Sequence, residues 1–297
     1  MNDYLKRSLG SRMFDFINIS FMIILAFAMV YPFLNLLALS LNDGTDAARG
    51  GIYLLPRKFS LSAYVFLFQN ANMFKGLTWS VLRVIVGTVT CLFATGLLAY
   101  IVTIRQFSGR RLLRLLFFIT MYFSGGLIPS YLLMMKLGLT NSFQVYWVPS
   151  LFNTYFMLLL ASYIQNLPEA LTESARIDGA SELRIFLQIV VPTSVPVFAA
   201  VAIYAAVNHW NSWFDVVLYN SSGKFDTLQV YLRSMLFQLE GIQDINDQQL
   251  LYNRFKDISP VTFRAATTML VTVPIMMVYP FLQRYFIGGI TLGSVKG

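Results

Sequence analysis

One arginine and a later cluster of polar and aromatic residues interrupt apolar stretches of the sequence. They are Arg83 and then Asn208, His209, Trp210, Asn211, Trp213 and Asp215. Sugars are held by aromatic faces together with amides and charged groups, so the cluster has the chemistry to contact a carbohydrate. In a second reading, Arg83 and Asp215 pair with each other or extend their charged ends toward water.

A second group of charged and small residues lies in the polar segment 165–191. Asn166 is expected to cap a short helix, with Pro168 in the first turn of that helix. Glu169 and Glu173 fall near its start, where the helix dipole favours negative charge. The segment therefore predicts a helix that begins close to residue 166.

A turn and a second short helix are expected to follow. Gly179 tolerates a positive φ, Ser181 can cap the second helix, and Pro192 marks the return to apolar sequence. The first helix would present small side chains that let another protein approach closely, namely Ala170, Ser174 and Ala175. A plainer interpretation is a surface helix that only connects two apolar segments.

Long apolar segments must position both groups. Of the 297 residues, 57% are hydrophobic and 12% are charged, against roughly 25% charged in an ordinary soluble domain. Six segments are long enough for the about 20 residues that a membrane span needs, and they are 14–41, 77–102, 113–135, 145–164, 192–217 and 264–284. The sequence therefore predicts an all-α membrane protein with about six transmembrane helices and argues against a soluble enzyme.

The charges around the first apolar segment indicate its orientation. Lys6, Arg7 and Arg12 precede it, whereas Asp43 and Asp46 follow it. Because basic residues accumulate on the cytoplasmic side, both termini are expected in the cytoplasm when the number of spans is even. The expected parts are a cytoplasmic N-terminus at 1–13, a membrane domain at 14–297, a cytoplasmic loop at 165–191, and outer segments at 43–76 and 218–262.

Glycine and proline are expected to interrupt two of the apolar segments. Gly125, Gly126 and Pro129 lie in the third segment, and Pro274 and Pro280 lie in the sixth. Such breaks are tolerated where neighbouring helices or a wet cavity satisfy the backbone. Each break is either a packed kink or a gating element.

The composition also argues against several other classes of protein. A formal charge of +8 would raise the question of nucleic acid, but the basic residues flank apolar segments, as do Arg105, Arg110, Arg111 and Arg114. We therefore expect no nucleic-acid partner. Cys91 is the only cysteine and His209 the only histidine, which predicts neither a disulfide framework nor a transition-metal site. The first apolar segment is too long for a cleaved signal peptide.

The spacing within segment 165–191 resembles a known signature. Glu173, Ser174 and Ala175 are followed by three residues, Gly179, nine residues, Ile189, one residue, and then Val191 and Pro192. This pattern is similar to the EAA motif of ABC importer permeases, which reads EAA, three, G, nine, I, one, LP. Ser in place of Ala and Val in place of Leu are the two departures, and both preserve side-chain size.

Further stretches resemble one branch of that family. Glu173 to Gly179 reads ESARIDG, as in the carbohydrate-uptake, maltose-type permeases of type I importers. The stretch Gly125 to Tyr131 and the tail Gly293 to Gly297 resemble the subgroup that imports oligosaccharides released from polysaccharides, with alginate and pectin fragments as the examples.

The resemblance implies a division of labour among several subunits. Segment 165–191 would be the coupling loop that docks on an ATPase subunit. Its docking residues would be Glu173, Ser174, Ala175 and Gly179, with Arg176 and Asp178 available for charged contacts. The implied partners are two cytoplasmic ATPase subunits, a second and different permease, an extracytoplasmic solute-binding protein and an oligosaccharide, in the bacterial cytoplasmic membrane.

No cofactor is expected in this chain, and Mg-ATP is expected in the ATPase subunits. Gly288 and Gly293 have the spacing that begins a P-loop, but Ser294 occupies the position of the required lysine. An alternative function is a secondary transporter or channel that needs no ATP, although proton-coupled carriers usually carry acidic or histidine relays in several spans. A membrane enzyme is a third possibility, and the sequence shows no shared catalytic constellation for it.

Overall fold

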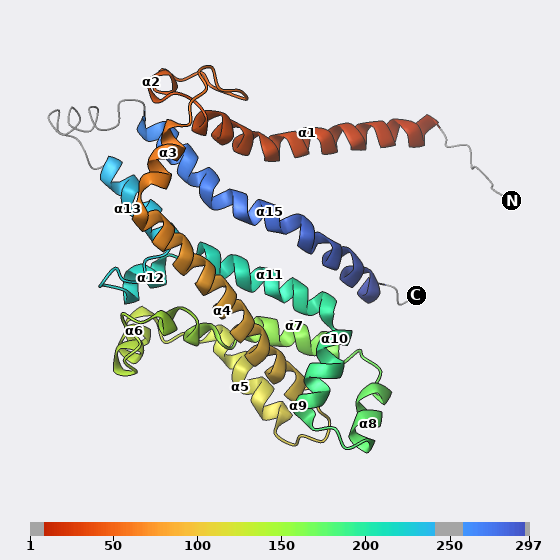
Figure 1. Cartoon of the computed structure of the whole chain (residues 1–297). Helices are drawn as coiled ribbons and strands as arrows, with labels where there is room; N and C mark the ends of the chain where they lie inside the picture. Colours follow the sequence, from red (N-terminus) through yellow and green to blue (C-terminus); the bar gives the residue numbers. More distant parts are fainter. Residues whose placement is uncertain (1–8, 241–257, 295–297) are drawn as a thin grey trace. The chain divides into compact units, whose positions relative to one another are not determined.

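The computed structural model describes residues 9–240 and 258–294, and this part of the chain is almost entirely helical (Figure 1). Its only β-type pairing is an isolated bridge between Asn42 and Phe59. Lys6, Arg7, residues 241–257 of the expected outer segment 218–262, and the end of the tail from Val295 lie outside the described residues. The chain divides into two compact units, Met1–Asn70 with Met235–Thr272 and Ala71–Ser234 with Val273–Gly297.

The first unit begins with a long apolar helix, α1 (Leu9–Ser40). Large apolar side chains are exposed along most of its length, as at Phe16 and Ile24. Water would make such a surface costly, whereas lipid or another apolar helix would not. The end of α1 is fixed to the loop that follows it, because the Asn35 side chain donates to the carbonyl oxygens of Ile52 and Tyr53 at 2.8 and 2.9 Å.

A charged loop follows α1 and contains the short helices α2 (Gly44–Ala47) and α3 (Ser62–Gln69). The Asp43 carboxylate caps α2 by accepting from the backbone N–H groups of Thr45 and Asp46, at 3.1 and 3.2 Å. Lys58 approaches Asp43 at 3.5 Å. Hydrogen bonding, first of all from the Thr45 side chain, lowers the pKa of Asp43.

The second unit is built around α4 (Ala71–Ile101), α7 (Thr154–Ile164) and α11 (Val195–Asn211). Figure 1 shows α4 running beside α11, and both helices pack on α7. Small residues allow the close approach, since a Cβ at Gly96 would lie 2.7 Å from the Phe198 ring. The core of this bundle contains Leu98, Ala99, Met157, Leu160, Phe186, Val201 and Ala205.

The third apolar segment does not form one straight helix. It consists of α5 (Arg110–Tyr122) and α6 (Leu127–Lys136), which meet at 120°. Gly126 adopts φ 87 at the junction, where an L side chain would be strained. Pro129 lies in the first turn of α6, where its missing N–H leaves no hydrogen bond unmade. The predicted break is confirmed, but it is a sharp reversal of direction and not a kink.

The fourth and fifth segments are also bent. The short helices η1 (Phe143–Tyr146) and η2 (Val148–Ser150) precede α7 at a bend of 47°. The stretch of α9 (Glu182–Ile185), the π-helix η3 (Phe186–Val190) and α10 (Val191–Thr193) meets α11 at 89°. Three helices in the described part are long and apolar enough to span a membrane, or up to six spans exist if each bent pair counts as one.

The sixth apolar segment lies in α15 (Pro260–Ser294). This helix is continuous through Pro274 and Pro280, so the prediction that these prolines interrupt it is wrong. A proline removes one hydrogen bond from the ladder, and a helix of 35 residues keeps enough bonds on either side to continue. The remaining helices in the described part of the chain are α8 (Ala170–Ile177), α12 (Phe214–Tyr219) and α13 (Leu228–Glu240).

Candidate functional site

The helix expected in segment 165–191 is α8, and it begins later than predicted. Asn166 does not cap it, because Asn166 lies three residues before the N-cap position of α8, and its amide donates to the Ser162 carbonyl at 2.8 Å at the end of α7. Pro168 precedes the helix, and its carbonyl accepts from Leu171 N at 3.2 Å. The N-cap position is Glu169, which makes no side-chain capping bond. The prediction of an Asn166 cap is therefore wrong.

The turn that ends α8 has the form predicted from its glycine. Gly179 has φ 80, its N–H donates to the Arg176 carbonyl at 3.0 Å, and Ala180 N donates to the Ala175 carbonyl at 2.9 Å. These two bonds define a Schellman motif, which favours glycine at the left-handed position. Ser181 then caps α9 by accepting from Arg184 N at 3.4 Å, as predicted.

One face of α8 is exposed and carries apolar as well as charged side chains. Figure 1 shows α8 set apart from the bundle of α4, α7 and α11. Its exposed residues include Ala170, Leu171, Glu173, Ser174, Ile177 and Asp178. Ile177 is 85% exposed, more than any other large apolar side chain in residues 10–237 and 258–278. The position of Ile177, three residues after Ser174 and seven after Ala170, is the signal that could have identified it from sequence.

Two of the predicted docking residues are held within the chain. Ala175 is partly buried and packs against the hydrophobic core of the bundle. Arg176 Nε forms an ion pair with Glu182 Oε1 at 2.8 Å, which raises the pKa of Arg176. The Tyr100 hydroxyl donates to Glu182 and accepts from Arg176 Nη2 at 3.4 Å. The sequence did not point to Tyr100 or Glu182, because they contact Arg176 from other elements.

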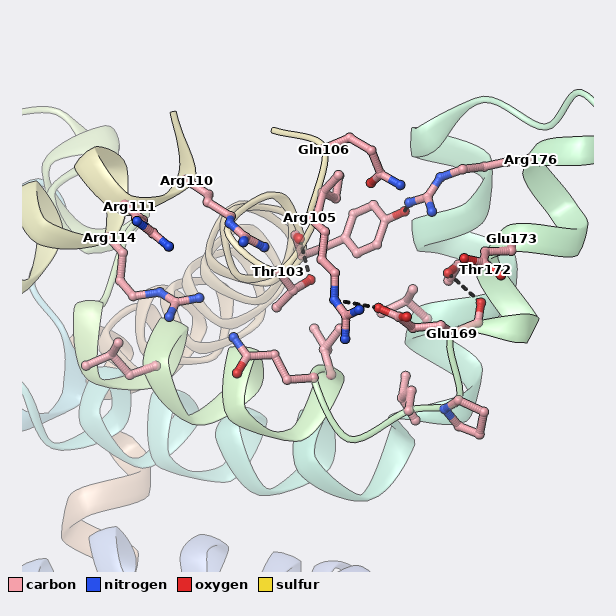
Figure 2. A pocket seen from close by; sticks show the side chains of 18 of the residues that line it. Thr103, Arg105, Gln106, Arg110, Arg111, Arg114, Glu169, Thr172, Glu173 and Arg176 are labelled. Atoms are coloured by element: carbon pink, nitrogen blue, oxygen red, sulfur yellow. Dashed lines mark hydrogen bonds and ion pairs between the residues drawn. The ribbon is translucent and has the colours of Figure 1, made fainter. Parts of the chain in front are cut away.

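A large cavity lies between α8 and the helices beside it. Its volume is about 1010 Å³, and its lining includes five arginines, namely Arg105, Arg110, Arg111, Arg114 and Arg176. Figure 2 shows Arg105 reaching toward Glu169, with which it forms an ion pair at 2.8 Å. Arg110 and Arg114 extend from the start of α5 on the other side of the view. The cavity is therefore strongly basic.

The polar residues in the second and fifth apolar segments come together around one ion pair. Arg83 Nη1 donates to Asp215 Oδ1 at 3.2 Å, and Arg83 Nη2 pairs with Asp215 Oδ2. Arg83 is 2% exposed. Its guanidinium lies 4.9 Å from the centre of the Tyr146 ring, and Ser212 Oγ donates to Asp215 Oδ1 at 2.7 Å. The reading in which Arg83 and Asp215 pair with each other is confirmed.

Three aromatic members of the cluster also have partners inside the protein. His209 is buried against Gly87, where a Cβ would overlap the imidazole ring. Trp210 is buried. Trp213 lies under Arg233, whose guanidinium is 3.6 Å from the ring centre. These contacts place His209, Trp210 and Trp213 in the packing of this end of the bundle.

The two remaining residues of the cluster are exposed and lie on one face of α11. Asn208 and Asn211 follow Tyr204, which is 52% exposed, at helical spacings of four and seven residues. Residues so spaced share a face. Tyr204 was not among the sequence candidates, although the same spacing could have identified it. Within the described residues, no group of three or more His, Cys, Asp or Glu side chains could hold a metal ion.

Comparisons with known proteins agree over most of the chain. Residues 93–291 match the family model described as binding-protein-dependent transport system inner membrane component. The polygalacturonan/rhamnogalacturonan transport system permease protein YtcP of Bacillus subtilis is 35% identical over 97% of this chain and 99% of the relative. The arabinooligosaccharides transport system permease protein AraQ of Halalkalibacterium halodurans is 31% identical over 92% of this chain and 93% of the relative.

A solved structure also resembles this fold. It belongs to a bacterial ABC transporter involved in the import of the acidic polysaccharide alginate. The TM-score is 0.85 at 25% sequence identity, and the match covers 94% of this chain and 98% of the other. The bends and breaks described above thus occur within a fold that is shared over nearly the full length of both chains.

Proposed function

Because this chain belongs to the family of binding-protein-dependent transport system inner membrane components, we propose that it is a permease subunit of an ATP-driven importer of acidic oligosaccharides. The observation that carries this proposal is the likeness to a polygalacturonan/rhamnogalacturonan permease over 97% of the chain. The alginate importer is a second relative whose name specifies an acidic polysaccharide. Both point to uronate-containing oligosaccharides as the substrate class.

The exposed face of α8 is the surface that would dock on an ATPase subunit. Ile177 supplies an apolar anchor, and Glu173, Ser174 and Asp178 supply polar contacts around it. Anchors of this kind surrounded by polar residues are typical of protein interfaces. Ala175, Arg176 and Gly179 would act indirectly, because they fix the position and the end of α8. Mg-ATP would be bound and hydrolysed by the two ATPase subunits, and this chain would not itself be an enzyme.

The proposed placement in the bacterial cytoplasmic membrane follows from this docking surface. The loop with α8 and the arginine-rich start of α5 would face the cytoplasm, together with residues 1–13 and the C-terminus. Segments 43–76 and 218–262 would then face outward, where a solute-binding protein delivers the oligosaccharide. Residues 14–297 would form the membrane domain, and a second, different permease would complete the translocation path.

The proposed substrate path runs along the exposed face of α11. Tyr204 offers an aromatic ring, and Asn208 and Asn211 offer amides, which are groups that hold sugars. The Arg83–Asp215 pair would support this region of the bundle without touching the substrate. The competing function is a secondary transporter. Such a transporter uses no ATPase, so the exposed face of α8 would have no docking role in it.

Reconstitution would test the proposal against its competitor. The chain would be purified from its native membrane with the proteins that accompany it and inserted into liposomes with the solute-binding protein. We expect ATP-dependent uptake of oligogalacturonides or alginate oligosaccharides and an ATPase among the co-purified subunits. Uptake that proceeds without ATP and without any partner would contradict the importer proposal.

A further inference from the structure

Three arginines in the cavity beside α8 lack the acidic partner that Arg105 has. Arg110, Arg111 and Arg114 all line the cavity, and none forms an ion pair with another described residue. Of the acidic side chains, only Glu169 and Glu173 line the same cavity, and Glu169 pairs with Arg105. The arginine charges therefore outnumber the carboxylates, which leaves positive charge for an anion.

Arg114 shows most directly that a partner is missing from this basic group. Its Nη2 donates to the Val102 carbonyl at 3.0 Å, whereas its Nε is buried and has no hydrogen-bond partner. A buried donor without an acceptor is costly, more so when the group is charged. An anionic oxygen that enters the cavity beside Arg114 would provide an acceptor.

The cavity also has an apolar wall. Leu115 and Phe118 line it from the same helix as the arginines, and Leu158 lines it from α7. Leu115 and Phe118 are 54% and 42% exposed. Because α5 is proposed to enter the membrane from its arginine end, the apolar wall lies deeper in the bilayer than the arginines. A basic group above an apolar wall matches the order of a phospholipid, with headgroup outward and acyl chain inward.

We propose that this cavity binds an anionic phospholipid of the cytoplasmic leaflet, with the lipid phosphate beside Arg110, Arg111 and Arg114. Basic pockets between spans on the cytoplasmic side are suited to anionic headgroups. One acyl chain lies against Leu115 and Phe118. The position of the apolar wall below the arginines in the bilayer rests on the membrane placement in the proposed function. Lipid binding can be measured without transport, so the two proposals can be tested separately.

The position of the lipid gives it a route to the coupling loop. Glu169, Thr172 and Glu173 of the α8 region line the same cavity, and Thr172 Oγ1 donates to the Glu169 carbonyl at 3.1 Å (Figure 2). A bound phosphate would attract Arg105 away from Glu169 or would share it. The lipid would thereby bias the position of α8 relative to α5.

Native mass spectrometry of the delipidated full chain, with any subunits that remain bound, would test this proposal. The probes are dioleoylphosphatidylglycerol, dioleoylphosphatidylcholine and inorganic phosphate. The variants are Arg110→Gln, Arg111→Gln and their combination. Arg184→Gln is the matched control, because Arg184 is an exposed arginine on α9 that does not line the cavity.

We expect the phosphatidylglycerol affinity to fall about fivefold for each cavity arginine removed and about 25-fold for the pair. Phosphatidylcholine should bind weakly, and Arg184→Gln should bind phosphatidylglycerol as the native chain does. Phe118→Ala should weaken the lipid but not inorganic phosphate. This variant also keeps the proposal testable if the arginine variants fail to fold.

Three results would overturn the proposal. The first is equal retention of phosphatidylglycerol by the native chain and by the arginine and Phe118→Ala variants. The second is tight binding of inorganic phosphate with no preference for the lipid, which would define a free-anion site. The third is displacement of the lipid by an oligogalacturonide, which would assign the cavity to the substrate. Failure of ATP-driven uptake, by contrast, would count only against the proposed function.

Discussion

Arg176 at the end of α8 and Glu182 at the start of α9 form an ion pair of 2.8 Å across the turn at Gly179. Tyr100 at the end of α4 contacts both side chains. Segment 165–191 is therefore linked by side chains to a long helix of the bundle. A movement of α8 that keeps these contacts would shift the end of α4. A movement that breaks them would leave Tyr100 without its contacts to Arg176 and Glu182.

Removing this ion pair should weaken the coupling of ATP hydrolysis to uptake. We expect Glu182→Gln to lower the number of sugars imported per ATP, because α8 loses its charged contact with α9. The pair is partly exposed, so its coupling energy in a double-mutant cycle with Arg176→Gln should be about 0.5–1 kcal/mol. Unfolding in detergent would give this energy, and uptake and ATPase assays would give the ratio. An unchanged ratio in both single variants would contradict the prediction.

Ile177 should dominate the docking of α8 on the ATPase. Ile177→Asp should cost about 2–4 kcal/mol of binding free energy, since it places a charge where an apolar anchor enters a pocket. Ile177→Leu is the matched control and should bind nearly as well as the native chain. Co-purification of the ATPase with each variant is the measurement. If both variants retain the ATPase equally, Ile177 does not contact it.

The Gly179 turn should accept asparagine better than alanine. A Cβ at Gly179 meets no atom within 4 Å, so any cost comes from its φ of 80 and not from crowding. Gly179→Ala should destabilise the turn by about 1 kcal/mol, whereas Gly179→Asn should cost less because asparagine tolerates this conformation. ATP-driven uptake should follow the same order, and Gly179→Pro should abolish coupling. Equal uptake by the alanine, asparagine and proline variants would show that the turn is not needed.

Acid should loosen the loop that follows α1. The lowered pKa of Asp43 means that the folded loop binds a proton more weakly than the unfolded chain does. The stabilisation is therefore present above the unfolded pKa of about 3.9 and is lost as the pH falls through the lower folded value. Hydrogen exchange of the Thr45 and Asp46 amides between pH 6 and pH 3, corrected for intrinsic rates, would follow this loss. Asp43→Asn should show a smaller pH dependence, and an equal dependence would contradict the assignment.

The Arg83–Asp215 pair should matter for folding and not for substrate affinity. Asp215→Asn leaves Arg83 buried without its counter-charge and should cost about 3–5 kcal/mol of stability. Replacing both residues, as Arg83→Met with Asp215→Leu, should recover much of the loss. Thermal unfolding in detergent would measure the two effects. A double variant that is stable but no longer imports sugar would instead place the pair in the substrate path.

Local signals in the sequence predicted the local features of the fold. Gly179 and Ser181 act on backbone groups within a few residues, and the structure has the turn and the cap where they predict them. The break at Gly126 was predicted for the same reason. Its angle of 120° was not, because the direction of a chain after a flexible residue depends on what each helix packs against.

Features that depend on distant contacts were missed. Asn166 had the residue type of a cap, but α8 begins only at Ala170, and the Asn166 amide donates to the Ser162 carbonyl at the end of α7. Tyr100 and Glu182 are 82 positions apart, and no pattern in either segment indicates their contact. The exposure of Ile177 was not predicted either, although its spacing from Ala170 and Ser174 places it on the same face of α8 as those two residues.

The π-helix η3 (Phe186–Val190) lies within the stretch from Glu173 to Pro192 whose spacing resembles the EAA motif. It affects how the helical segments on its two sides are rotated relative to each other. Each residue of an α-helix turns the chain by about 100°, since a turn takes 3.6 residues. A π-helical turn holds about one more residue than an α-helical turn, so it takes up one additional residue while the helical segments on either side keep nearly the same phase. The nine residues between Gly179 and Ile189 pass through this wide turn. Losing one residue here would let the wide turn close into an α-helical turn, so α9 would keep nearly the same rotation about the helix axis relative to α10 instead of turning by roughly a quarter of a circle.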